Sequence, residues 1–144
     1  MEPKQVIVMR VDTNPKMRRG KQIAQGAHAS LAVLLDIFFG EYGNRNWLKT
    51  KFKNQNVYSS SISMNDSDPI FQWINNSFIK VVVQGDLNDV VNSYNEAKKA
   101  GIPCSLIEDK GLTEFGGKVT ITCCAIGPDD PEKIDKITGH LKLL

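Results

Sequence analysis

The sequence predicts an α/β fold: a single domain with a mixed four-stranded sheet, three strands parallel and one antiparallel, and helices on both faces. Four short runs are rich in Val and Ile, as buried strands are: 5–11, 78–84, 103–107 and 119–126. Helical patterns separate the first three runs, and such crossovers make the strands parallel. The connection before the last run is short, which predicts an antiparallel strand.

Length and composition are typical of one globular domain. The chain has 144 residues, of which 41% are hydrophobic and 24% charged, and its formal net charge is +2. These values exclude disordered and highly charged classes of protein. The N-terminus carries no signal peptide, and no apolar run approaches the ~20 residues of a membrane span. We therefore expect a cytoplasmic protein without membrane contact.

The three cysteines, Cys104, Cys123 and Cys124, do not indicate a disulfide framework, because their number is odd. The adjacent pair points to opposite faces of a strand. We interpret all three as small apolar residues in a reducing compartment.

The first helix is predicted over 21–39, after the first strand and a polar loop that contains Pro15. On a helical wheel, Lys21, Gln25 and His28 fall within a narrow arc. The opposite side is apolar and is expected to pack against the core: Ile23, Ala27, Leu31, Leu34 and Leu35. The polar arc then forms one wall of a pocket.

The remaining elements follow from periodicity and from Gly and Pro positions. The segment 44–77 is the least regular, and we expect a short helix over 46–52, an exposed loop over 54–68 and helical turns from Pro69. Amphipathic helices are predicted over 87–100 and after Pro131.

The order of the elements along the chain also predicts where the site lies. Ligands of such sheets bind beyond the carboxyl ends of the parallel strands. Asp12 and Asp109 follow two of these strands, and the helix that contains Lys21 begins at the same edge. Lys21 and Asp109 could therefore share one pocket, and the order of the strands in the sheet decides how close they come.

The residues available there suit hydrolysis. Asp109 can orient or deprotonate water. Thr113, Gln25 and helix N–H groups can hold an oxyanion, and Lys21 can bind a phosphate. The alternative is that these residues are structural. His28 would then be an ordinary helix histidine, Asp109 would cap a turn, and Thr113 would be an ordinary loop residue.

Familiar metal and nucleotide motifs are missing from the sequence. The Gly20-Lys21 pair lacks the earlier glycine and the following Ser or Thr of a phosphate-binding loop, and no GxGxxG follows a strand. No Cys or His grouping has zinc spacing. We expect no metal and no cofactor.

Basic residues form two local groups, although the net charge is small. One lies around the start of the first helix, at Lys16, Arg18, Arg19 and Lys21; the other comprises Lys49, Lys51 and Lys53. Such groups can hold phosphates. The alternative is a solvated loop and helix face.

Several blocks, in the right order, resemble the second class of peptidyl-tRNA hydrolases, the archaeal and eukaryotic type. The first block is Val8-Met9-Arg10-Val11-Asp12 with Gly20-Lys21-x-x-Ala24-Gln25-x-x-His28-Ala29. The second is Ser105-Leu106-Ile107-Glu108-Asp109-x-Gly111-x-Thr113, and the third is Ala125-Ile126-Gly127-Pro128 with the segment from Ile134 to Leu143. The resemblance covers residues 1–144 except an extended insert at about 40–77.

This resemblance implies a metal-independent esterase that hydrolyses the bond between a peptide and the 3′ ribose of tRNA. It implies catalytic roles for Lys21, Asp109 and Thr113, a pocket wall of Gln25 and His28, and a supporting role for Asp12. We expect the tRNA to contact Lys16, Arg18, Arg19 and Lys110. Because many members are dimers, it also implies a homodimer.

The chain departs from the family at the loop after the third strand. That loop usually reads Asp-Ala-Gly-Arg-Thr-Gln, whereas here it runs from Asp109 to Glu114 with Lys110 and Leu112 at changed positions. Glu114 should weaken phosphate binding locally. The insert lysines either contact tRNA or belong to an inert elaboration. Two other functions stay open: a non-catalytic adaptor for RNA or protein, which retention of Asp109 and Thr113 disfavours, and an esterase for another acylated tRNA or small ester.

Overall fold

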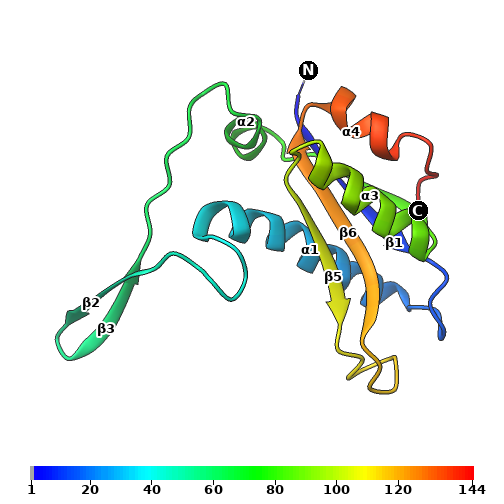
Figure 1. The fold of residues 1–144 in the computed structure, drawn as a ribbon, viewed down its shortest axis with the longest axis horizontal. Coiled ribbons are helices and arrows are strands. Elements are labelled where there is room, and N and C mark those ends of the chain that lie inside the picture. The colour runs from blue at the N-terminus through cyan, green and yellow to red at the C-terminus, as the bar shows by residue number, and fades with distance from the viewer. Residues whose placement is uncertain (1) are drawn as a thin grey trace.

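The computed structural model describes residues 2–144 (Figure 1). The elements along the chain are β1 (Lys4–Arg10), α1 (Arg19–Phe39), β2 (Leu48–Phe52), β3 (Gln55–Ser59), α2 (Pro69–Asn75), β4 (Lys80–Gly85), α3 (Leu87–Lys99), β5 (Cys104–Asp109), β6 (Thr120–Asp129) and α4 (Pro131–Thr138). The predicted α/β class and the mixed four-stranded sheet are confirmed.

The main sheet has the strand order β4-β1-β6-β5. β1 pairs in parallel with β4, whereas β6 pairs antiparallel with both β1 and β5. In the described chain, the β1–β4 pair is therefore the one pair of hydrogen-bonded parallel neighbours in this sheet. Since β6 lies between β1 and β5, it separates the strand before Lys21 from the strand that ends at Asp109.

The core consists of two hydrophobic clusters that use alternate residues of the strands. Val6 and Val8 of β1 belong to the cluster that contains Val90 of α3 and Ile134 of α4. Their neighbours Ile7 and Met9 belong to the cluster that contains Ala29 and Val33 of α1. This division follows from the two-residue repeat of a strand. It places α1 against one set of strand side chains, and α3 and α4 against the other (Figure 1).

The predicted packing of α1 is wrong. Ile23 and Leu31, expected in the core, are 67% and 54% exposed. The buried residues are smaller or polar: Gln25, Gly26, Ala29, Ser30 and Val33. Small side chains let the helix approach the sheet closely, and Ser30 donates a 2.5 Å hydrogen bond to buried Gln5.

The apolar side of α1 instead lines an open groove. The groove has a volume of about 1060 Å³ and includes Leu34 and residues of α2 such as Ile74. By length and composition alone α1 is long and apolar enough to cross a membrane, contrary to the sequence-based expectation. A core helix passes the same test, and α1 packs on the sheet through Ala29 and Val33.

The predictions for the insert are also wrong in part. Residues 48–59 form a hairpin of β2 and β3, where a short helix and a loop were expected. Lysines alternate with Leu48, Thr50 and Phe52 along β2, which is the period of a strand. The two turn residues, Lys53 and Asn54, have φ of 48° and 61°, as a type I′ hairpin turn requires. The helix expected from Pro69 is confirmed as α2.

Candidate active site

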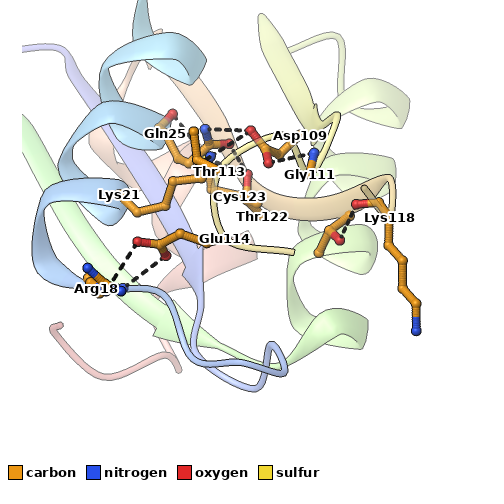
Figure 2. Close-up of polar contacts among 11 residues, drawn as sticks. Arg18, Lys21, Gln25, Asp109, Gly111, Thr113, Glu114, Lys118, Thr122 and Cys123 are labelled. Atoms are coloured by element: carbon orange, nitrogen blue, oxygen red, sulfur yellow. Dashed lines mark hydrogen bonds and ion pairs between the residues drawn. The ribbon is translucent and has the colours of Figure 1, made fainter. Parts of the chain in front are cut away.

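The predicted pocket forms where the loop after β5 passes the first turns of α1. A cavity of about 330 Å³ lies there, and it is lined by side chains of both segments, including Lys21, Gln25, His28, Asp109, Lys110 and Thr113. Figure 2 shows Lys21 and Gln25 reaching from the helix toward Asp109. The structure therefore brings together six of the residues named from the sequence.

Asp109 is the centre of the polar contacts. Its Oδ1 accepts hydrogen bonds from Lys21 Nζ at 2.8 Å and from Gln25 Nε2 at 3.3 Å. Its Oδ2 accepts one from the backbone N–H of Gly111 at 2.9 Å. Three donors thus fix the orientation of one carboxylate at the mouth of the cavity.

Lys21 is held by more than its ion pair. Its Nζ also donates to Thr113 Oγ1 at 2.9 Å and lies 5.7 Å from the centroid of the Phe115 ring. The side chains of Lys21 and Asp109 are only 12% and 15% exposed. Limited access of water makes this pair stronger than a surface ion pair.

These contacts determine the ionisation of Asp109. Burial raises the pKa of its carboxyl group. The hydrogen bonds from Lys21 and Gly111, and the Lys21 charge, outweigh burial, so the pKa of Asp109 lies below its ordinary value. Asp109 is therefore ionised at neutral pH.

Gln25 is positioned by β6, which sequence reasoning missed. Thr122 Oγ1 donates to Gln25 Oε1 at 2.5 Å, and both residues are buried. The register between β5 and β6 shifts between Ile107 and Glu108, so Thr122 is an extra residue on β6. Such a bulge re-aims side chains. No sequence signal separates Thr122 from Thr120 in the same strand, because both are threonines in an otherwise apolar run.

Cys123 supports the same helix turn. Its Sγ donates to the backbone carbonyl of Gln25 at 3.3 Å. Burial raises the pKa of the Cys123 thiol to about 12. The thiol therefore stays protonated at neutral pH, which suits a buried donor and not a nucleophile.

Asp12 lies outside the cavity. Its carboxylate accepts a 2.7 Å hydrogen bond from Arg10 Nε, and this bond lowers the pKa of Asp12. Arg10 is held in turn by a bond from its Nη1 to the carbonyl of Ile121. The sequence argument placed Asp12 at the correct sheet edge, but its side chain turns to Arg10.

The predicted basic residues lie around the start of α1. Lys16, Arg18 and Arg19 are exposed, and Arg18 Nε lies 3.7 Å from Glu114. The N-cap residue Arg18 makes no side-chain cap, and the first turn of α1 contains no acid, but the Glu114 carboxylate accepts a 3.4 Å hydrogen bond from the Arg18 backbone N–H. The positive end of the helix dipole favours an anion, and Glu114 already places one carboxylate there.

Gly111 shapes the loop, because no other residue fits its position. Its φ is 75°, and a Cβ atom there would lie 2.7 Å from the backbone nitrogen of Lys118 and closer still to its carbonyl oxygen. We expect Gly111→Ala to lower the free energy of unfolding by about 2–4 kcal/mol, measured by urea denaturation.

Gly116→Ala is the matched control for this prediction. Gly116 also has positive φ, 57°, but a Cβ atom added there would have no neighbouring atom within 4 Å. Its substitution should lower the free energy of unfolding by only about 1 kcal/mol. Equal losses in the two variants would show that the contact with Lys118 does not matter.

Within residues 2–144, no group of three or more His, Cys, Asp or Glu side chains is arranged to hold a metal ion. The donors around Asp109 are instead an ammonium, an amide and a backbone N–H. This set can orient water beside a carboxylate and neutralise a developing negative charge.

Comparison with known proteins gives consistent results. The family described as Peptidyl-tRNA hydrolase PTH2 matches residues 3–144. Curated relatives named peptidyl-tRNA hydrolase are 37% identical in both Methanocaldococcus jannaschii and Methanothermobacter thermautotrophicus, over 98% of this chain and 99% of each relative. A solved structure of a protein of unknown function from Agrobacterium tumefaciens is similar in fold, with a TM-score of 0.51, 12% identity, and coverage of 100% of this chain and 98% of that chain.

Proposed function

The chain belongs to the peptidyl-tRNA hydrolase family PTH2, and from this we propose that its Asp109 cavity is the site of peptidyl-tRNA hydrolysis. The reaction cleaves the ester between the peptide and the 3′ ribose, and it releases free tRNA. The observation that carries the assignment of the site is the convergence of Lys21, Gln25 and Gly111 on one ionised carboxylate.

In the proposed mechanism, Asp109 orients a water molecule toward the ester carbonyl carbon. As the water oxygen bonds to that carbon, Asp109 accepts a proton. The tetrahedral intermediate then loses the ribose oxygen, which takes a proton as the carbon–oxygen bond breaks. A lowered pKa makes Asp109 a weak base, so it returns this proton readily to the leaving oxygen.

Lys21 and Thr113 stabilise the developing oxyanion in this proposal. The ammonium group of Lys21 already lies between Asp109 and the Thr113 hydroxyl, at 2.8 and 2.9 Å. The N-terminal end of α1 adds partial positive charge nearby. Preorganised donors of this kind need little reorganisation during the reaction.

The terminal phosphates of the tRNA are proposed to bind Lys110, which lines the cavity, and the exposed basic residues around the start of α1, namely Lys16, Arg18 and Arg19. Glu114 reduces the positive charge of this surface, because its carboxylate contacts Arg18. A cytoplasmic location, a homodimer and one domain over residues 1–144 stay predictions.

A hydrolysis assay tests the function and the need for metal together. Purified protein is incubated with an N-blocked aminoacyl-tRNA in excess EDTA, and free tRNA is measured. We expect turnover at the rate seen without EDTA, because the proposed chemistry uses Asp109, Lys21 and Thr113 alone.

The other outcomes separate the alternatives. Retention of the RNA without release of its acyl group would contradict the enzyme and support an adaptor. Equal hydrolysis of a small ester would contradict specificity for peptidyl-tRNA. Loss of activity in EDTA, restored by a divalent metal, would contradict the metal-independent mechanism.

A further inference from the structure

The insert concentrates positive charge in an arm, which we define as residues 42–65. The arm contains four basic residues and no acidic residue: Arg45, Lys49, Lys51 and Lys53. Because the whole chain has a formal net charge of +2, the rest of the chain is net negative. The arm is therefore a second basic segment, besides the one around the start of α1, in a protein proposed to act on a polyanion.

One face of the β2–β3 hairpin in the arm is basic and polar. Lys49 lies opposite Tyr58 and Lys51 lies opposite Asn56, so these four side chains share one face. All residues of β2 and β3 are exposed, and Lys49 Nζ lies 5.9 Å from the centroid of the Tyr58 ring. Lysine, tyrosine and asparagine side chains are typical donors to nucleic-acid phosphates.

The base of the arm is fixed to the end of α1. Trp47 stacks on Phe39 with ring centroids 4.8 Å apart. Arg45 Nη1 donates to the carbonyl of Gly40 at 2.6 Å and lies 3.3 Å from Asp36. The charge of Arg45 is therefore used within the chain, to hold the base of the arm. Lys49, Lys51 and Lys53 form no ion pair with another residue of the described chain.

The tip of the arm carries a lysine against the local backbone preference. Lys53 has φ of 48°, a conformation in which Gly or Asn is favoured. Its Nζ lies 5.5 Å from the Phe52 ring centroid, on an exposed turn. The geometry of the turn therefore does not explain the lysine, whereas its charge at the tip would suit a phosphate.

We propose that the basic face of the arm, formed by Lys49, Lys51 and Tyr58 with Lys53 at its tip, binds the phosphate backbone of the tRNA body. This proposal rests on the proposed function, which supplies the RNA. The arm leaves the far end of α1 from the cavity (Figure 1). Phe39 lies 18 positions after Lys21, which is about 27 Å along the helix at 1.5 Å per residue. A tRNA whose 3′ end enters the cavity is large enough to reach both.

Comparing two substrates tests the proposal. One is a full-length N-blocked aminoacyl-tRNA, and the other is a short 3′ oligonucleotide that carries the same acyl group. The variant is Lys49→Gln with Lys51→Gln and Lys53→Gln. We expect it to raise KM for the full-length substrate about 10-fold at moderate salt, with a shallower salt dependence of KM, since three phosphate contacts are lost. Hydrolysis of the oligonucleotide should not change.

The matched control is Lys98→Gln with Lys99→Gln and Lys136→Gln, which removes three exposed lysines from α3 and α4. An equal rise in KM in this control would overturn the proposal, because the effect would be one of net charge. An unchanged KM in the arm variant would overturn it directly.

A second variant separates charge from folding. Lys53→Gly removes one charge but fits the left-handed turn better. We expect about a twofold rise in KM for full-length substrate, with hydrogen exchange of the hairpin unchanged or slower. If KM is unchanged, the tip does not touch RNA and the proposal is wrong in that part.

Direct binding distinguishes failure of the arm from failure of the function. Deacylated tRNA binding, followed by fluorescence anisotropy, needs no catalysis. If the wild-type protein hydrolyses neither substrate but the arm variant still binds tRNA more weakly, the proposed function fails and the arm assignment holds. If the variant instead loses binding to anionic vesicles and keeps tRNA binding, the arm assignment is overturned in favour of a membrane surface.

Discussion

Asp109→Asn is expected to lower kcat for an N-blocked aminoacyl-tRNA by about two to four orders of magnitude. The amide keeps the size of the carboxylate but cannot accept a proton from water. It also loses the charge that attracts Lys21, whose Nζ lies 2.8 Å from Oδ1. Single-turnover kinetics with saturating enzyme would measure the chemical step, separate from tRNA binding.

The control is Asp135→Asn on α4. Asp135 is also paired with a lysine, at 2.6 Å from Lys4 Nζ, but it lies on the helix that packs on the opposite core cluster. Its replacement should leave kcat near the wild-type value. If Asp109→Asn is equally active, Asp109 does not handle the water, and another group must be sought.

Lys21→Gln is the second substitution with a large expected effect, a fall in kcat/KM of about two to three orders of magnitude. The variant removes the charge beside the proposed oxyanion and the donor shared by Asp109 and Thr113. Most of the loss should appear in kcat, because the charge acts on the transition state. Steady-state kinetics across substrate concentrations would separate kcat from KM.

The same variant predicts a shift in the pH profile. Burial raises the pKa of Asp109, while Lys21 lowers it by a hydrogen bond and by its charge. Without Lys21 the raising effect remains, so the pKa of Asp109 should increase. Because the ionised form is active, the acid limb of kcat/KM should move to higher pH in Lys21→Gln. In the wild-type protein this limb should lie below the ordinary pKa of an aspartate.

Lys118→Gln provides the control for that shift. Lys118 belongs to the same loop, but its side chain is exposed and points away from Asp109 (Figure 2). The acid limb of kcat/KM in Lys118→Gln should coincide with that of the wild-type protein. An acid limb that stays in place in Lys21→Gln would mean that Asp109 is not the group that titrates there.

Much of the fold could be predicted from the sequence, because it depends on local patterns. Short Val- and Ile-rich runs identify the four strands of the main sheet, and apolar periodicity identifies α3 and α4. Proline and aspartate positions predict the starts of α2 and α4, where Asp68 and Asp130 cap the first turns. Local patterns fail at the insert, where a short segment with a lysine at every second position forms a strand and not the expected helix.

The sequence also predicted that Lys21 and Asp109 lie at one edge of the sheet, because crossover connections place both there. The strand order β4-β1-β6-β5 then decided how close they come. Only the tertiary structure decided how the site is supported. Gln25 is buried, against its polarity, because its amide is satisfied at both ends by residues distant in the chain: Thr122 is 97 positions away and Asp109 is 84. Sequence periodicity describes one helix at a time, whereas the burial of a polar side chain depends on the hydrogen-bond partners that the neighbouring strand supplies. The bulge in β6 supplies Thr122 as the partner of Gln25, while the side of α1 that contains Ile23 and Leu31 lines an open groove.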